Sequence, residues 1–440
     1  MRLSARFLVP IIAAVALAGG LLGYAWWQLR DTEYFLRTQI QKTDTGEQAV
    51  TATGAVASSV DDTTGDIVLI HLRQGDLLAL QGDWSGAERE YQQSADAGGG
   101  IAALRRLAQA QMQRREIDKV QGTIKELRRL GARSEDLLLL SLIIDLRTGK
   151  IALAEQALAA AADSPQKHYG AALLAIIQAK HDQAKVELKA VQNGWDPTLR
   201  SYARTLSAAY DEFALFPESR DIHLTTLLSR ALAQVQECEL ALPLLAQVVS
   251  QQDDYRDAWT VQGYCELTTE RTNDALASFE KAYAIDPEKP EIQYFLGRTY
   301  VVLKQWKNAA TFLQYALVNG FEPKKEVRRR LAEAAELAGD LPLALEQNAA
   351  LLTEPDADID LFQKTVTLAI GQDKKEDAYQ FAQSALKKWP DSAKAEELVG
   401  ISAAATDRKD EAKAALEKAL KMDPTLVEAK TQLKVLMETK

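Results

Sequence analysis

The first 65 residues contain three successive patterns of apolar and polar positions. Residues 7–27 form an apolar run, close to the length of about 20 residues that a helix needs to cross a bilayer. Residues 31–41 are short and amphipathic, and residues 42–65 are mostly Thr, Ala, Asp, Gly, Ser and Val without helical periodicity. We therefore predict a signal anchor or transmembrane helix over residues 1–30 and a flexible tether over residues 31–65.

The charges beside the apolar run predict its orientation. Arg2 and Arg6 precede the run, whereas Arg30 after it is offset by Asp31 and Glu33. The positive-inside rule then places the N-terminus in the cytoplasm and the remainder of the chain on the other side of the membrane.

An alternative for the same segment is a cleaved signal peptide. Ala16, Leu17 and Ala18 resemble a cleavage site, and cutting there would yield a soluble secreted protein. Such a cut would leave residues 19–27 as an apolar remnant. This remnant favours a retained anchor.

A period of 34 residues runs through the second half of the chain. Six alanines are separated, by subtraction of their numbers, by 34, 34, 35, 34 and 34 residues. Three glycines each precede one of them by 12 residues, and three prolines each follow one by 12. The pattern predicts pairs of antiparallel helices whose backbones approach at the small residues and which end at proline. The residues are Ala241, Ala275, Ala309, Ala344, Ala378 and Ala412, with Gly263, Gly297 and Gly400, and Pro287, Pro390 and Pro424.

One unit of this period shows the whole pattern, namely Trp259, Gly263, Ala275, Phe279, Ala282 and Pro287. These residues resemble the tetratricopeptide repeat (TPR), whose tryptophan, glycine, alanine, phenylalanine and proline positions they match. The resemblance implies an all-α fold, a TPR-type α-solenoid of antiparallel helix pairs, preceded by one N-terminal transmembrane helix. Composition agrees, because 440 residues contain only 12 prolines and 23 glycines.

The quality of the repeat divides the chain further. The pattern is strong over residues 222–424, and we expect a capping helix over residues 425–440. It is degenerate over residues 66–195, and the phase is lost over residues 196–221, which we expect to be an irregular connector. The whole array should contain about ten helical hairpins.

Net charge limits the class of partner. A formal charge of -10 disfavours general nucleic-acid binding, which needs a basic surface. Residues 105–133 are locally basic, with nine Lys and Arg residues against three acids. This stretch is either a solvated helical face or a surface for an anionic partner or lipid.

The sequence contains no recognisable catalytic, cofactor or metal motif. The two cysteines, Cys238 and Cys265, occupy positions suited to packing, although they could pair as a disulfide outside the cytoplasm. The four histidines are scattered without metal-ligand spacing. An enzyme domain would need about 100 further residues outside the repeats, so we expect no catalysis, no cofactor and no metal.

The resemblance also implies a peptide-binding groove lined by the first helix of each pair. Arginine and aromatic side chains at the groove positions would suit an extended peptide with acidic groups. A groove that is merely solvated remains the alternative. The groove residues implied are Arg230, Tyr264, Tyr294, Phe295, Arg298, Arg329 and Arg330.

Together these features suggest a non-catalytic scaffold that binds another protein and is tethered to a membrane. By resemblance to anchored bacterial TPR proteins, we expect an envelope assembly such as secretion, pilus, cytochrome maturation or polysaccharide export, with the repeats in the periplasm. The alternative is a receptor or adaptor that faces the cytoplasm. The sequence leaves the oligomeric state open.

Overall fold

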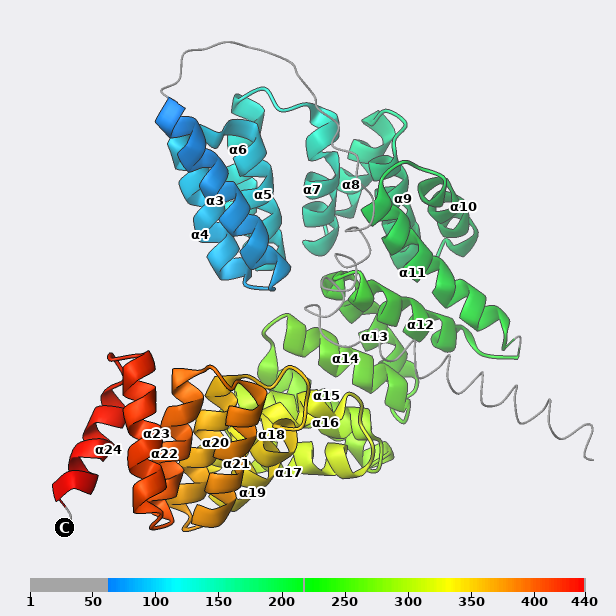
Figure 1. Ribbon diagram of the computed structural model, residues 1–440. Helices are drawn as coiled ribbons and strands as arrows, with labels where there is room; N and C mark the ends of the chain where they lie inside the picture. Colours follow the sequence, from blue (N-terminus) through cyan, green and yellow to red (C-terminus); the bar gives the residue numbers. More distant parts are fainter. Residues whose placement is uncertain (1–61, 217, 439–440) are drawn as a thin grey trace, which may run out of the picture. The chain divides into compact units, whose positions relative to one another are not determined.

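The computed structural model describes residues 62–216 and 218–438, and every regular element in those ranges is a helix (Figure 1). The chain divides into two compact units, one ending at Asp253 and the other beginning at Asp254. The predicted anchor over residues 1–30 lies outside the described residues, as does most of the predicted tether. Helix α3 (Asp62–Leu80) begins within the last four tether residues. Within the described ranges, no helix combines the length and apolar character required to cross a bilayer.

In its described residues, the first unit consists of hairpins and one additional helix. A short π-helical turn, η1 (Ala95–Gly99), joins the first two hairpins, and the additional helix is α11 (Pro197–Ala214). The hairpins are α3 with α4 (Trp84–Ser94), α5 (Gly100–Gln113) with α6 (Ile117–Arg129), α7 (Ser134–Arg147) with α8 (Ile151–Ala160), α9 (Pro165–Ile177) with α10 (His181–Gln192), and α12 (Asp221–Gln234) with α13 (Cys238–Gln251).

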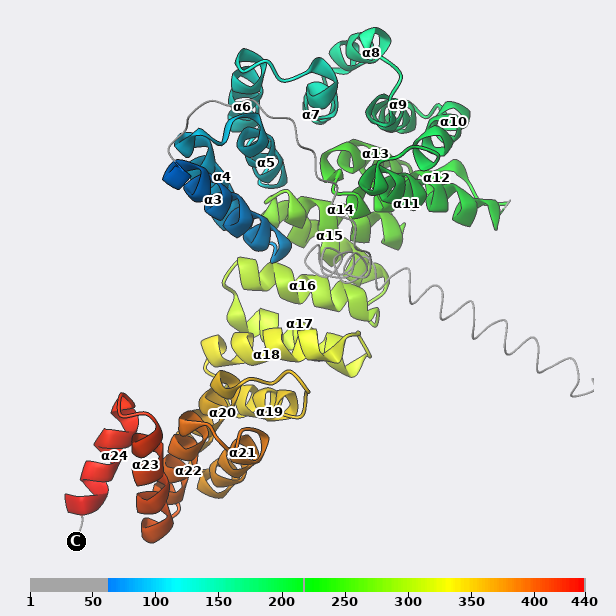
Figure 2. The same ribbon diagram turned by 45° about the horizontal axis from the view of Figure 1, so that its top comes forward.

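The second unit is a regular succession of hairpins. Figure 2 shows them following one another in chain order, and the last helix, α24 (Val427–Glu438), lies within residues 425–440. The hairpins are α14 (Arg256–Thr268) with α15 (Thr272–Ile285), α16 (Pro290–Val302) with α17 (Trp306–Val318), α18 (Lys324–Ala338) with α19 (Leu341–Leu351), α20 (Ile359–Gly371) with α21 (Lys375–Lys388), and α22 (Ala393–Ala405) with α23 (Lys409–Met422).

The same hydrogen bond closes the turn in all ten hairpins of the two units. Just after the first helix, one residue adopts a positive φ, and seven of these ten residues are not glycine. The amide of the next residue donates to the carbonyl five positions earlier at 2.7–3.0 Å, as in a Schellman motif. The bond satisfies a carbonyl at the helix end while the chain reverses. The left-handed residues are Gly82, Arg115, Gly149, Ala179, Gln236, Glu270, Lys304, Gly339, Asp373 and Asp407.

Small residues set the distance between the two helices of a hairpin. All six motif alanines are fully buried. A Cβ added at Gly263 would lie 2.8 Å from Phe279, and one added at Gly400 would lie 2.5 Å from Leu416 Cγ. These glycines therefore allow the large side chain of the second helix to pack directly on the backbone of the first.

The predicted connector over residues 196–221 is wrong, because most of it is helix α11. Asp196 accepts hydrogen bonds from the amides of Thr198 and Leu199, and Pro197 occupies the first turn, so the helix has a regular start. The helix packs against α10 and α12. The 34-residue phase is lost because a single helix stands between two hairpins.

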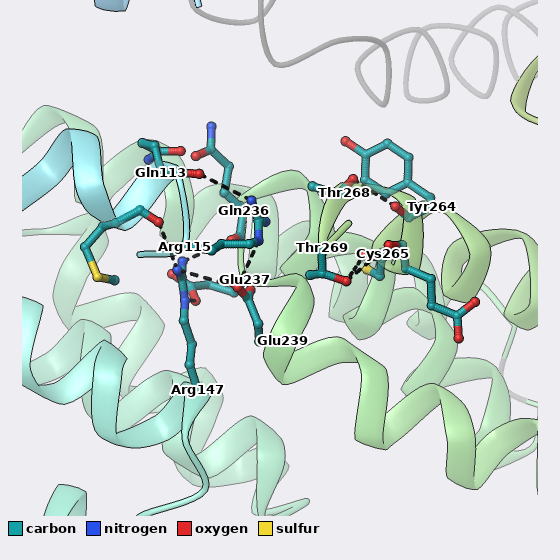
Figure 3. A network of polar contacts seen from close by, with 12 residues as sticks. Gln113, Arg115, Arg147, Gln236, Glu237, Glu239, Tyr264, Cys265, Thr268 and Thr269 are labelled. Carbon is teal, nitrogen blue, oxygen red and sulfur yellow. Dashed lines mark hydrogen bonds and ion pairs between the residues drawn. The ribbon is translucent and has the colours of Figure 1, made fainter. Parts of the chain in front are cut away.

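A cluster of charged side chains joins distant segments of the first unit (Figure 3). Arg147, the last residue of α7, donates from Nε to Glu237 Oε2 at 2.9 Å and from a terminal nitrogen to the Gln236 carbonyl at 3.2 Å. Arg115 Nε lies 2.9 Å from Glu239 Oε1. We call Arg115, Arg147, Glu237 and Glu239 the arginine–glutamate brace. It connects the α5–α6 turn, the end of α7 and the α12–α13 turn.

Helices α12 and α13 belong to the first unit, although their sequence is part of the strong repeat block over residues 222–424. Helix α12 packs on α11, and the brace adds a link from the α12–α13 turn to α7. The side chains of Arg147 and Glu237 are only 7% and 5% exposed. Burial raises the pKa of Glu237 above its ordinary value, and the charge and hydrogen bond of Arg147 act against that rise. A buried pair of this kind must stay together, because either charge alone would be poorly solvated.

We predict that R147L destabilises the first unit by about 3–5 kcal/mol at neutral pH, because Glu237 then stays buried without its counter-charge. The pKa of Glu237 in the folded state is already raised, and it should rise further in the variant. Protonation therefore favours the folded variant, so the loss should shrink as the pH falls towards the ordinary glutamate range. Urea unfolding at about pH 5 and about pH 7.5 measures both effects.

The double variant R147L/E237L provides the control for this prediction. Apolar side chains in place of both partners leave no buried charge, so most of the lost stability should return. A double variant as unstable as R147L, or a loss in R147L that is independent of pH, would contradict a charge-based role for the brace.

We also predict that G400A is less stable than G371A by about 1–3 kcal/mol. Both substitutions remove the same helix-propensity penalty of glycine. The added methyl group would collide with Leu416 at position 400, whereas no atom lies within 4 Å of the added Cβ at position 371. Thermal or urea unfolding of both variants gives the difference. Equal stabilities would show that the close packing at Gly400 is unimportant.

Candidate binding surface

The predicted groove residues fall in both units. Arg230 on α12 belongs to the first unit, where it forms an ion pair with Glu212 of α11. The other six residues lie on α14, α16 and α18 of the second unit. Six of the seven predicted groove residues thus share the second unit.

The aromatic residues predicted for α16 lie in the interior. Tyr294 is 3% exposed and its ring stacks on Phe321, with centroids 4.2 Å apart. Phe295 is 5% exposed and stacks on Phe279 at 5.4 Å. These rings fill the space between successive hairpins, so the structure corrects their assignment as direct peptide contacts. They position the more exposed residues around them.

Tyr264 and Arg298 remain half-exposed. The ring of Tyr264 meets Phe295 edge to face at 5.6 Å. The guanidinium of Arg298 lies over the ring of Tyr294, 5.8 Å from its centroid. Stacking on a buried ring restricts the side chain of Arg298, and a planar guanidinium held in this way suits a carboxylate.

Helix α18 carries the strongest local charge of the second unit. Residues 324–330 contain five cations and one acid, Glu326, and both Arg329 and Arg330 pair with that acid at 2.6 Å. Even so, the side chain of Arg329 is 64% exposed. Positive charge at the start of a helix is unfavourable beside the helix dipole, so stability alone does not explain this cluster.

The basic cluster and Arg298 are linked through one loop. Phe321, which stacks on Tyr294, lies three residues before the first residue of α18. The face of α16 that carries Tyr294 therefore adjoins the start of α18. We call the cations at this place the α16–α18 basic surface: Arg298, Lys324, Lys325, Arg328, Arg329 and Arg330.

The groove positions carried over from the family omitted Lys324, Lys325 and Arg328. Lys325 forms an ion pair with Asp356, and Arg328 donates to the side-chain oxygen of Gln347 at 2.8 Å. The run of charges itself was the signal for these residues, because it is visible in the sequence as KKEVRRR. Cations with restricted geometry can bind the carboxylates of an acidic peptide.

Most of the cations in the other basic stretch, over residues 105–133, form ion pairs. Glu88 accepts hydrogen bonds from Arg114 and from Lys119. Burial raises the pKa of Glu88, but the hydrogen bonds and charges of these two cations together outweigh burial and lower the pKa. Arg115 belongs to the brace, and Arg106 pairs with Asp76 at 2.9 Å. These pairs favour a structural role for the stretch.

The cysteines and histidines of the described residues serve packing and polar contacts. Cys238 and Cys265 are both buried thiols rather than halves of a disulfide. His168 lies between Glu187 and Asp163, at 2.6 and 3.0 Å, and His181 contacts the hydroxyl of Tyr210 at 3.2 Å. Among the residues with described side chains, no group of three or more His, Cys, Asp or Glu could hold a metal ion.

Comparison with protein families identifies the repeat. Sequence models described as tetratricopeptide repeat match residues 226–290, 267–319 and 399–426. No curated protein matches the chain significantly.

Solved structures give a consistent set of similarities. YrrB, described as a TPR protein with an unusual peptide-binding site, is 18% identical, covers 43% of this chain with 97% of its own, and has a TM-score of 0.35. A tetratricopeptide repeat protein from Parabacteroides merdae ATCC 43184 is 18% identical over 60% and 99% of the chains, with a TM-score of 0.30. A thermophilic TPR protein of Thermus thermophilus is 18% identical over 47% and 98%, with a TM-score of 0.28.

The family matches coincide with the helix pairs and with the period of 34 residues. Proteins built from this repeat generally act as scaffolds for protein interactions and are typically not enzymes. The motif alanines are buried between paired helices, as the repeat requires. Residues 226–319 and 399–426 therefore consist of tetratricopeptide repeats.

Proposed function

We propose that this protein is a non-catalytic scaffold that binds an extended, acidic segment of another protein on its α16–α18 basic surface. The observation that carries this proposal is the cluster of five cations at the start of α18, with Arg298 held over the Tyr294 ring. The whole chain has a net charge of -10, so a basic surface of this kind stands out against its surroundings. Arg side chains of restricted geometry favour bidentate contacts with carboxylates.

We further propose that the scaffold is tethered to a membrane by residues 1–30, with the repeats outside the cytoplasm. The apolar run over residues 7–27 and the positions of Arg2 and Arg6 support this topology. The scaffold would organise an envelope assembly of the bacterial inner membrane and periplasm, such as secretion, pilus, cytochrome maturation or polysaccharide export. The alternative topology is a receptor or adaptor facing the cytoplasm, and a secreted form would follow from signal cleavage.

The binding surface is tested with the double variant R298A/R329A. A fluorescent, extended peptide rich in Asp and Glu should lose affinity by at least about tenfold, because two cations that contact carboxylates are removed. Fluorescence anisotropy at low and moderate salt measures the change, and binding by the wild type should weaken with salt.

The matched control removes two exposed lysines from second helices, K281A/K307A. This variant has the same change of net charge, so it should retain the affinity of the wild type. Equal losses of affinity in both variants would mean that net charge alone determines peptide binding. Unchanged binding in R298A/R329A would place the peptide elsewhere.

The topology is tested by fusing a reporter after Lys440. Alkaline phosphatase folds to an active form only outside the cytoplasm, where its disulfides form, so we expect an active fusion in intact bacteria. A fluorescent protein that matures only in the cytoplasm provides the reciprocal fusion and should be dark. Activity of the reporters in the opposite sense would support the adaptor that faces the cytoplasm.

A further inference from the structure

Helix α3 presents an apolar stripe to solvent. Ile67, Ile70, Leu77 and Leu80 are 47%, 52%, 58% and 37% exposed. Their spacing of three, seven and three residues places them on one side of the helix. We call these four residues the α3 apolar face.

The packing of α3 differs from that of later first helices. Helix α5 contacts α4 and α6, and seven of its 14 residues are buried. Helix α3 packs mainly on α4, beside which it lies at the start of the array in Figure 1. Between residues 67 and 80 only Gly75 is buried. The side of α3 that a preceding helix would cover is therefore open in the described part of the chain.

The last described helix, α24, exposes a more polar surface than α3. Of the eight exposed residues of α24, five are polar or charged, which suits a helix that faces water. Of the seven exposed residues between positions 67 and 80, five are Ile or Leu. A continuous exposed apolar stripe usually marks a contact surface. Helix α3 thus has the surface of an internal helix, although it is the first helix in the described part of the chain.

We propose that residues 31–41 of the same chain cover the α3 apolar face. This segment carries Tyr34, Phe35, Leu36 and Ile40, and it precedes α3 in the chain. Its apolar residues supply the surface that the face lacks. The proposal does not depend on a membrane anchor or on the peptide partner proposed above.

The connection between the two parts has the required reach. Residues 42–61 lie between them, and a coil of this length spans about 25 Å on average and about 66 Å at full extension. Helix α3 has 19 residues and is therefore about 28 Å long. A short flexible connection gives an effective concentration of roughly millimolar, which favours the chain's own segment over a second copy.

Charge is complementary at the same place. Arg73 is exposed and lies between the two halves of the α3 apolar face. Asp31 and Glu33 precede the apolar residues of the segment. A segment lying along α3 could thus bring a carboxylate to Arg73 while its rings cover Ile70 and Leu77.

Disulfide trapping in the full-length chain tests the proposal. L36C/L77C should form a disulfide within one chain under mild oxidation, at least about ten times faster than L36C/V186C. Val186 is the control because it is 68% exposed and lies on α10, which packs against α9 and α11. Cys238 and Cys265 are buried and remain in both variants.

Each alternative result overturns the proposal. Equal rates in the two variants would mean that residue 36 samples the surface at random. A disulfide between two chains would assign the face to a second copy. If no disulfide forms at all, the segment lies elsewhere.

Hydrogen exchange gives a second measurement without engineered cysteines. L77E changes an exposed residue, so the hairpin should still fold, but the buried charge should release the segment. Amides of α3 should then exchange at least about ten times faster, whereas V186E should leave them unchanged. Identical exchange of α3 in both variants would contradict docking. Neither measurement uses the peptide or the topology, so failure here leaves the proposed function standing.

Discussion

The left-handed turn that closes each hairpin is the constraint on which the rest of the array depends. Its hydrogen bond ends the first helix and reverses the chain within a few residues. Only then can a large side chain of the second helix, such as Phe279, reach the glycine of the first. Seven of the ten turns accept a side chain in this conformation, at about 1–2 kcal/mol each. The packing of the paired helices must outweigh that strain.

The contacts that stabilise the inside of each unit differ. The second unit relies on contacts between successive helices, as expected for a repeat array. The first unit contains the additional helix α11, and its brace pairs residues far apart in the sequence, Arg147 with Glu237 and Arg115 with Glu239. The brace depends on the turn geometry too, because Gln236 is left-handed and its carbonyl accepts from Arg147. The α12–α13 turn thus closes its own hairpin and also contacts α7, a distant segment.

The sequence was sufficient for the repeats because their packing needs particular residue types. Ala275 and Gly263 must be small, and Pro287 ends a helix, so their spacing is visible without a structure. The left-handed turns were not predicted, because Ala179, Glu270 and Lys304 share no side-chain chemistry. In these turns a backbone conformation repeats and a residue type does not.

Two further features depended on neighbours that a linear sequence does not reveal. Helix α11 begins at a clear cap, Asp196 with Pro197, but it has no in-phase partner, so a repeat pattern could not include it. Tyr294 has the residue type of a binding hot spot, yet Phe321 from the following loop covers it. Burial of an aromatic residue is decided by the next hairpin and not by its own helix.

The two basic stretches show how the same charge pattern can have different uses. In residues 105–133, acids from other helices, including Glu88 and Glu239, approach the arginines and bind the stretch into the fold. In residues 324–330, five cations meet one acid of their own helix, and Asp356 supplies a second. Positive charge is left over at a helix start, where the helix dipole opposes it. An outside group with negative charge would relieve that repulsion, which supports the proposal that the second stretch contacts a partner.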